Sequence, residues 1–87
     1  MWTYDEYPYQ CNRLAAIAFE LYSKDLTYVY LVGIKRGGHW ISCHLAQDKM
    51  EKEQFLFPEP LPRNLTLDQL TGWIQERLKT EPVLSLL

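Results

Sequence analysis

The residues of this 87-residue chain that could carry nucleophilic or metal chemistry are two cysteines and two histidines, Cys11, His39, Cys43 and His44. Cys43 and His44 are adjacent, which suggests a thiol activated by an imidazole. Adjacent side chains of a β-strand leave on opposite faces, so these two groups do not share a proton. His39 shares a face with Cys43 but lies four residues away, on the order of 13 Å along a strand. A thiol nucleophile would need a base that only tertiary folding can supply.

The same cysteines and histidines lack the spacing of a metal site, because no pair is separated as on a helix face or in a zinc knuckle. Ser42 and His44 lie two residues apart on one strand face, but no acid is placed to orient the histidine as in a serine hydrolase. The phosphate-binding patterns GxxxxGK and GxGxxG are absent from the sequence. We therefore predict no catalytic residue, no metal and no cofactor, and a small enzyme of unknown type is only the third functional hypothesis.

Composition and charge indicate a single globular domain over residues 1–87. The chain is 47% hydrophobic and 14% aromatic, which excludes intrinsic disorder, and its longest apolar run, residues 29–34, is too short to span a bilayer. The net charge is −2, and only Lys35 and Arg36 form a basic pair, so a strong electrostatic grip on nucleic acid or a membrane is not expected. No signal peptide is visible, and two cysteines are too few for a disulfide scaffold. These features favour a cytoplasmic protein.

The strongest structural signal is a β-hairpin at residues 26–46, in which two strand-forming runs flank Gly37 and Gly38. A two-residue turn at these glycines pairs Ile34 with Ile41, and it gives one continuous apolar core face: Tyr30, Val32, Ile34, Ile41, Cys43 and Leu45. The opposite face then carries a mixture of apolar and polar side chains: Val29, Leu31, Lys35, Trp40, Ser42 and His44. Gly33 lies diagonal to Trp40, so we expect the indole ring to cover the glycine.

Two helices and a short third strand are expected around the hairpin. Asn12 caps a helix over residues 13–23 with a wide apolar face, and an aromatic arm, residues 1–10, precedes it. A strand at residues 54–57 follows the hairpin. A capping box at residues 66–69 starts the last helix, and an apolar tail, residues 83–87, follows it. The predicted inner face of this helix consists of Leu67, Leu70, Trp73, Ile74, Arg77 and Leu78. The predicted fold is α+β, an antiparallel three-stranded sheet flanked by two helices in the order α-β-β-β-α.

This order of elements resembles that of the double-stranded-RNA-binding domain. The last helix of that family needs a basic start to contact phosphates, whereas here it starts with TLDQ at residues 66–69, with Asp68 where a cation belongs. Agreement in element order alone says nothing about function. Nucleic acid is therefore an unlikely partner and the second functional hypothesis, with four residues at the turn end of the hairpin as its contacts: Lys35, Arg36, Trp40 and His44.

An excess of apolar surface favours protein binding. In a meander of three strands the first strand, residues 26–34, lies at a sheet edge, yet it is the most apolar strand, and an exposed edge of this kind aggregates unless something pairs with it. The tail at residues 83–87, a second copy or another protein could pair with it. We therefore predict a non-enzymatic protein-binding module, an adaptor, regulator or inhibitor that forms a homodimer through the sheet edge or an apolar face. The predicted partner contacts are Trp40, His44, Leu31, Val29, Ser42, Lys35 and Arg36.

Overall fold

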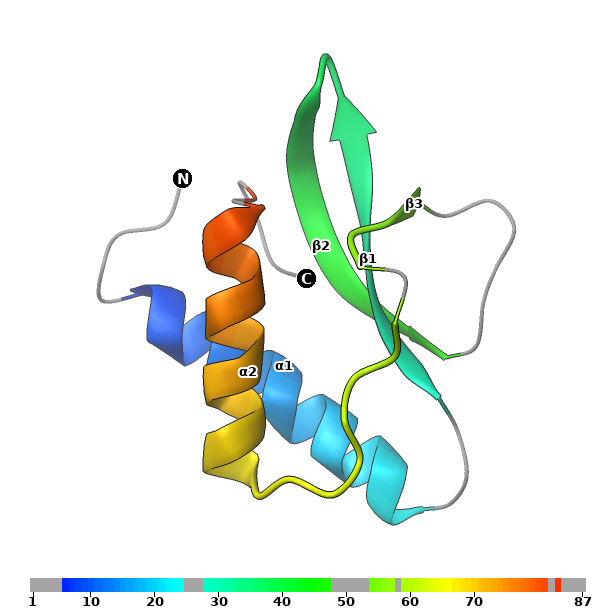
Figure 1. The fold of residues 1–87 in the computed structure, drawn as a ribbon, viewed down its shortest axis with the longest axis vertical. Helices are drawn as coiled ribbons and strands as arrows, with labels where there is room; N and C mark the ends of the chain where they lie inside the picture. The colour runs from blue at the N-terminus through cyan, green and yellow to red at the C-terminus, as the bar shows by residue number, and fades with distance from the viewer. Residues whose placement is uncertain (1–5, 25–27, 48–53, 58, 82, 84–87) are drawn as a thin grey trace.

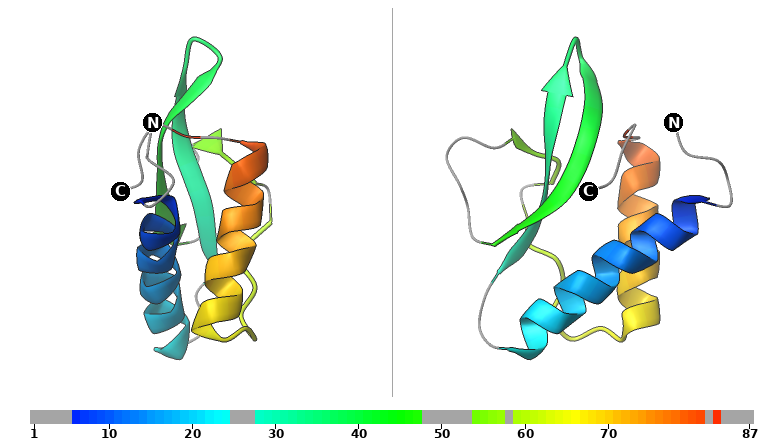
Figure 2. Two further views of the ribbon diagram at one scale, coloured as in Figure 1. Left: turned by 90° about the vertical axis from the view of Figure 1, so that its left-hand side faces the viewer. Right: turned by 180° about the vertical axis from the view of Figure 1, so that it is seen from behind.

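The computed structural model describes residues 6–24, 28–47, 54–57, 59–81 and 83. Its elements follow in the order α1 (Glu6–Ser23), β1 (Val29–Arg36), β2 (His39–Gln47), β3 (Gln54–Phe55) and α2 (Leu67–Thr80). The two helices cross on one side of the molecule and the hairpin stands beside them, with β2 nearer to the helices than β1 (Figure 1). Seen from behind, α1 passes diagonally across α2 (Figure 2). The molecule is consequently flat, with extents of 36 × 33 × 17 Å.

The expected three-stranded meander is wrong. The sheet is a two-stranded antiparallel pair, β1 and β2, between two helices in the order α-β-β-α. β3 adds only two residues, which pair with Val32 and Gly33 of β1 rather than with β2. Two further backbone hydrogen bonds join the chain after β3 to the same edge of β1. They run from Leu56 N to Leu31 O at 3.2 Å and from Leu61 N to Val29 O at 2.7 Å. The first strand is therefore not the exposed edge from which self-association was predicted.

Three prolines follow the short third strand in the sequence. Residues 58, 60 and 62 are prolines, and proline has no backbone N–H with which to continue a ladder. Among the described residues, the chain from Leu56 to Leu61 accordingly contacts β1 through separate hydrogen bonds instead of a regular strand. The Tyr22 hydroxyl at the end of α1 completes this junction, because it donates to Leu61 O at 2.7 Å and accepts from Val29 N at 3.3 Å.

The hairpin turn forms as predicted, but a bulge follows it in β2. Gly37 and Gly38 have φ values of 59° and 81°, the positive φ that a two-residue hairpin turn demands. Next to the turn, Lys35 pairs with Trp40 in the predicted register. The register then shifts between Ile34 and Lys35, so that all later pairs are offset by one residue. Ile41 is the extra residue of β2, and such a bulge re-aims the side chains beyond it.

The bulge changes which residues of β1 join the main core. Cys43 now lies opposite Gly33, and Leu45 opposite Leu31. Val29 and Leu31, which were placed on the outer face, therefore lie in the core, whereas Ile34, which was placed in the core, is 50% exposed. On β2 the prediction holds for Cys43, which is buried in the core. A slip of one residue moves the side chains of one strand to the other face. Val32, which was also placed in the core, is nevertheless completely buried, where β1 pairs with β3.

The first helix starts at Glu6, seven residues earlier than the predicted start at residue 13. Pro8 belongs to the predicted aromatic arm, but it lies in the first turn of α1, where backbone N–H groups have no partner within the helix in any case. Asn12 is consequently not a cap; its Nδ2 donates to Thr71 Oγ1 of α2 at 3.5 Å. Residues 6–10 of the predicted aromatic arm are thus helical, and residues 1–5 lie outside the described residues.

The second helix starts as predicted. Thr66 Oγ1 accepts a hydrogen bond from Gln69 N at 3.2 Å, and Gln69 Oε1 accepts one from Thr66 N at 3.0 Å, which is a complete capping box. Its buried residues are Leu70, Ile74 and Leu78, at spacings of four that keep them on one face. The remaining side of α2 is free to form surface.

One apolar core joins the helix pair to the hairpin. Four core residues of α1 are small or medium in size, Cys11, Leu14, Ala15 and Ala18, which allows α2 to lie close to α1. The other core residues come from the hairpin, the connection, α2 and the end of the chain: Val29, Leu31, Trp40, Cys43, Leu56, Leu61, Leu70, Ile74, Leu78 and Val83. In the part of the chain that the structure describes, neither helix combines the length and the apolar character needed to cross a membrane.

Candidate interaction surface

The seven residues predicted to contact a partner do not form one surface. Val29 and Leu31 are buried in the core and face the helices. Ser42 and His44 belong to the opposite face of the sheet; Ser42 is 8% exposed, its Oγ has no hydrogen-bond partner within the described ranges, and His44 is half-buried. The remaining three residues, Lys35, Arg36 and Trp40, lie near the hairpin turn.

Trp40 interacts with its own chain. The side chain is only 9% exposed, and its Nε1 donates to Glu81 Oε2 at 3.0 Å, just beyond the C-terminal end of α2. The Lys35 Nζ lies 5.1 Å from the centroid of the ring, and the Trp40 backbone forms a parallel bridge with Val83. As predicted, the ring covers Gly33: a Cβ built there would lie 3.0 Å from Trp40 Cε3. Trp40 thus fastens the hairpin to the end of α2.

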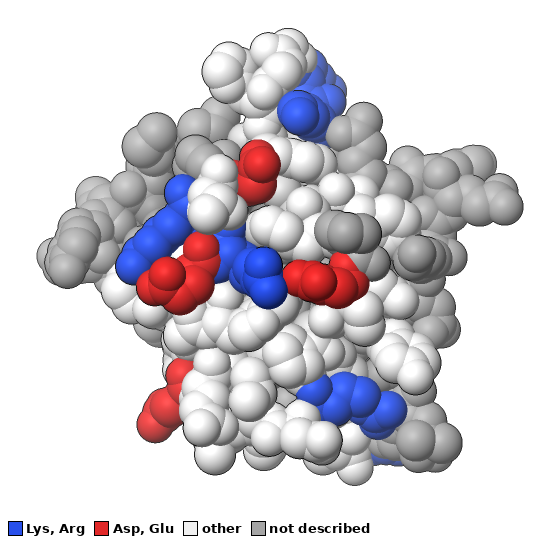
Figure 3. Space-filling model, in the orientation of Figure 1, with Lys and Arg blue, Asp and Glu red and all other residues white. Residues whose placement is uncertain are grey.

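The exposed basic pair at the hairpin tip adjoins the Trp40 cluster through Lys35. Lys35 and Arg36 are both exposed beside the turn, at the top of Figure 1. A basic patch is visible there in the space-filling view, whereas acidic and basic side chains alternate across the middle of the same face (Figure 3). A groove or surface that binds nucleic acid normally carries a continuous basic stripe. This face has no such stripe among the described residues.

Both cysteines are free and buried. Burial raises the pKa of the Cys11 thiol to about 11. Burial, together with the neighbouring Cys11 thiol, raises the pKa of Cys43 to about 12. Both groups are therefore protonated near neutral pH, and the thiolate is the form that attacks substrates or binds metals. Among the residues that are described, no three His, Cys, Asp or Glu side chains are grouped closely enough to hold a metal ion.

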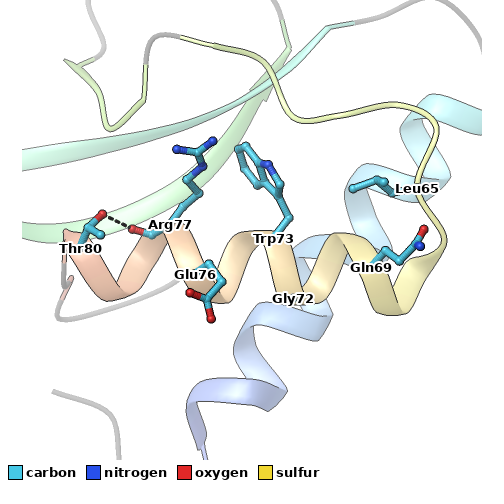
Figure 4. Close-up of a pocket in the computed structure, with 7 residues that line it drawn as sticks. All are labelled: Leu65, Gln69, Gly72, Trp73, Glu76, Arg77 and Thr80. Carbon is cyan, nitrogen blue, oxygen red and sulfur yellow. Dashed lines mark hydrogen bonds between the residues drawn. The ribbon is translucent and has the colours of Figure 1, made fainter.

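A groove that sequence reasoning missed runs along the solvent side of α2. It has a volume of about 510 Å³, and its lining residues are Leu65, Gln69, Gly72, Trp73, Glu76, Arg77 and Thr80. Trp73 and Arg77 point together toward the connection that leads into α2, and Glu76 points away from them (Figure 4). The groove therefore has an aromatic and apolar wall on one side and a polar rim on the other.

Arg77 is held in place on the Trp73 ring. Its Cζ lies 4.8 Å from the ring centroid, and its Nη2 lies 3.1 Å from Glu59 Oε1. Both partners of the ion pair are about half exposed, so the pair is worth only ~0.2–1 kcal/mol. Its main effect is to fix the orientation of the guanidinium group. Tryptophan and arginine are the residue types that most often dominate the binding energy of protein interfaces.

Gly72 is the second unusual feature of the groove. It lies in the interior of α2, where glycine costs about 1 kcal/mol relative to alanine. A glycine inside a helix often allows close packing, but a Cβ built at Gly72 meets no heavy atom within 4 Å. Within the described parts of the chain, no neighbour occupies the space left by the missing side chain. Among the described residues, no contact explains why α2 has a glycine at position 72.

Helix α1 also leaves large apolar side chains in solvent. Phe19 is 47% exposed and Ile17 is 46% exposed, although the sequence placed both on a wide buried face. With 3.6 residues per turn, the two side chains leave on different shoulders of the helix, so they do not form one patch. Neither side chain lines the α2 groove.

Comparisons with protein-family models, with curated proteins and with solved structures found no match to this chain. The functional proposal therefore rests on the surface chemistry of the molecule itself.

Proposed function

We propose that this chain is a small non-enzymatic protein-binding module, an adaptor, regulator or inhibitor, and that the α2 groove is its contact surface. One observation supports this more than any other. Trp73 is half-buried at the wall of the groove, and Arg77 is fixed on its ring by Glu59. A pre-oriented aromatic and guanidinium pair loses little side-chain freedom when a partner binds, so more of the contact energy appears as affinity.

The rim of the groove points to a protein rather than to a polyanion. Glu76 lies 3.1 Å from Lys79, and Arg77 is paired with Glu59, so both signs of charge alternate along the rim. A nucleic acid backbone would be repelled by the two carboxylates. A polypeptide that brings an apolar side chain to Trp73 and hydrogen-bonding groups to the rim fits this chemistry.

The two free cysteines support the proposal that the protein works in the cytoplasm. Both thiols are buried in the core and unpaired with each other. Extracellular domains of this small size are usually held together by disulfides, whereas reduced thiols are the normal state in the cytoplasm.

Site-specific photo-crosslinking in cells that produce the protein tests the proposed surface. A photoreactive amino acid replaces Glu76 in the groove, and in a matched control it replaces Glu20 on α1. Both glutamates are exposed helical residues that form an ion pair with a lysine, at 3.1 Å and 3.4 Å. We expect position 76 to give several-fold more protein adduct than position 20. Equal yields at the two positions would contradict the proposed surface.

A second pair of variants tests the role of the aromatic wall. Trp73→Ala in the presence of the photoreactive residue at position 76 should reduce the adduct strongly, because the partner loses its apolar contact. Phe19→Ala serves as the control, since Phe19 is an exposed aromatic residue of the other helix. A loss of adduct with Phe19→Ala and not with Trp73→Ala would assign binding to α1 instead. The mass of the adduct identifies the partner.

A further inference from the structure

The hydrogen-bonding groups that remain available in the α2 groove are mostly donors. Trp73 Nε1 has no hydrogen-bond partner within the described chain and is not a buried atom, so it is open to solvent. Gln69 uses its side-chain oxygen to accept from Thr66 N, which leaves its NH2 group available. The Arg77 guanidinium carries five N–H groups, and its ion pair with Glu59 engages only Nη2. A ligand of this groove must therefore supply acceptors.

The charges around the groove are already paired within the chain. Arg77 Nη2 lies 3.1 Å from Glu59 Oε1, and Lys79 Nζ lies 3.1 Å from Glu76 Oε1. The Glu76 carboxylate also points away from Trp73 (Figure 4). A charged ligand would therefore find no unpaired charge to neutralise. The surface complements an uncharged ligand that is rich in hydrogen-bond acceptors.

The groove is long enough for an extended peptide. Its lining residues on α2 run from Gln69 to Thr80, and at a rise of 1.5 Å per residue this stretch is about 16 Å long. Gly72 leaves one side of this stretch bare, because a Cβ there would meet no heavy atom of the described chain within 4 Å. Trp73 follows directly and forms the aromatic wall. A polyproline II segment, with a rise of about 3.1 Å per residue, spans this length with about five residues.

Peptides of different conformation bring different groups to such a groove. A helical peptide satisfies its own backbone carbonyls, so it offers only side chains to the donors. A β-strand brings N–H groups as well as carbonyls, but the carboxylates of Glu59 and Glu76 that would accept from them are in ion pairs. A proline-rich peptide brings exposed carbonyls and apolar rings, and its prolines have no N–H groups. This last combination matches the donors, the aromatic ring and the balanced charges together.

We infer that the α2 groove binds an uncharged, proline-rich segment of a partner protein in the polyproline II conformation. This inference rests on the proposed function, because it names the chemistry of the partner for the surface assigned there. A proline ring of the segment packs on the Trp73 indole, and Nε1 donates to a backbone carbonyl. Gln69 and Arg77, one helical turn before and after Trp73, donate to the carbonyls on either side. Gly72 lets the segment approach the helix backbone.

Fluorescence polarisation with fluorescein-labelled decaproline tests the inference with the whole chain. Decaproline adopts the polyproline II conformation, and its peptide bonds carry no N–H groups. The wild-type protein should bind it saturably. A labelled decapeptide of alternating glycine and serine should bind at least tenfold more weakly, because it is flexible and lacks the rings. Equal affinity for the two peptides, or no binding of decaproline, would overturn the inference.

Two substitutions at Trp73 separate the ring from its N–H group. Trp73→Phe keeps an aromatic ring and removes Nε1, so the dissociation constant for decaproline should rise several-fold. Trp73→Ala removes both groups and should raise it at least tenfold. Phe19→Ala is the matched control, since Phe19 is an exposed aromatic residue of α1, and it should leave the dissociation constant within twofold of wild type. Unchanged binding by Trp73→Ala, or an equal loss with Phe19→Ala, would contradict the assigned groove.

Gly72→Gln separates binding from folding. Glutamine is a better helix former than glycine, and the fold leaves open space for it, so the melting temperature should not fall. The dissociation constant for decaproline should rise at least tenfold, because the new side chain fills the space that the segment needs. Binding as tight as that of the wild type would overturn the inference.

The crosslinking experiment distinguishes failure of this inference from failure of the proposed function. A preferred adduct at position 76, together with no binding of decaproline, overturns the proline-rich segment and leaves the protein-binding surface in place. Equal adduct yields at positions 76 and 20 overturn the surface itself. An adduct whose crosslinked partner peptide contains several prolines supports both.

Discussion

Trp40 and Trp73 have the same kind of neighbours, yet the molecule uses the two rings in opposite ways. Each ring has a cation over its face, with Lys35 Nζ at 5.1 Å from Trp40 and Arg77 Cζ at 4.8 Å from Trp73. Trp40 is enclosed and joins the hairpin to the end of α2. Trp73 lines an open groove. A cation over the ring therefore does not determine whether a tryptophan is buried in the core or lies at the surface.

The glycine beside each ring explains the difference. The space at Gly33 is filled, because a Cβ there would lie 2.6 Å from Ser42 O and 3.0 Å from Trp40 Cε3. The space at Gly72 is empty to a distance of 4 Å. Gly33 therefore forms the surface against which the Trp40 ring packs, whereas Gly72 leaves backbone exposed next to Trp73. A tryptophan and glycine pair thus belongs to internal packing in the hairpin and to an open groove on α2.

Replacing the two tryptophans with alanine should give the largest contrast in stability. Trp40→Ala removes a core side chain and a hydrogen bond to Glu81, so we expect a loss of about 3–5 kcal/mol in the free energy of unfolding. Trp73→Ala removes a half-buried ring, and the loss should remain below about 2 kcal/mol. Urea denaturation followed by circular dichroism measures both. Equal losses would show that the two rings do not differ in structural role.

Gly33→Ala should give the next largest effect. The new methyl group would meet the Ser42 carbonyl oxygen at 2.6 Å, and a backbone atom can move only with the strand. We expect the free energy of unfolding to fall by about 1–3 kcal/mol. The same substitution in a Trp40→Ala background should still destabilise, because the contact with Ser42 O remains. Full stability of Gly33→Ala would contradict the close packing at this position.

The enclosed region around Trp40 also includes Cys43, which pairs with Gly33 across the hairpin. Burial raises the pKa of this thiol from 9.0 to about 12, so the folded state keeps the proton that the unfolded state loses. The stabilisation is complete below pH 9 and is lost as the pH rises toward 12. Between pH 9 and pH 10 the contribution of Cys43 should fall by roughly 1 kcal/mol. Urea denaturation of wild type and Cys43→Ala at both pH values should show a shallower pH dependence in the variant.

The sequence predicts local elements well where a few residues define them. The positive φ of Gly37 and Gly38 and the capping box of Thr66 and Gln69 both follow from adjacent residue types. The bulge at Ile41 does not follow from adjacent residue types. Isoleucine has no special tendency to bulge, and the shift accompanies the contacts of Trp40 with Glu81 and with Gly33, both of which involve residues distant in the sequence or on the other strand. Tertiary contacts therefore set the register, and with it the buried face of β1.

The sequence did not predict the candidate surface, because the apolar pattern of α2 fits both a wide and a narrow buried face. Trp73 and Arg77 are spaced by four residues beside Ile74 and Leu78, so they were assigned to the inner face of α2. In the structure only Leu70, Ile74 and Leu78 are fully buried, whereas Leu67 and Trp73 are partly buried and pack against the edge of the core. The pattern alone does not tell how wide the buried face of a helix is. Gly72, a glycine in the interior of an otherwise regular helix, did not contribute to the prediction, and this residue is the signal that would have directed attention to this side of α2.

The two glycines provide the smallest and most specific test of the contrast between the rings. Gly72→Ala should raise the free energy of unfolding by about 0.5–1 kcal/mol, because alanine favours the helix and the methyl group meets no atom of the described chain. The measurement is made by urea denaturation of dilute protein, so that association does not add to stability. The same chemical change at Gly33 lowers stability, hence the two variants should differ in sign. A loss of stability in Gly72→Ala would mean that the space beside Trp73 is filled by the chain itself, and the α2 groove would then resemble the enclosed packing around Trp40.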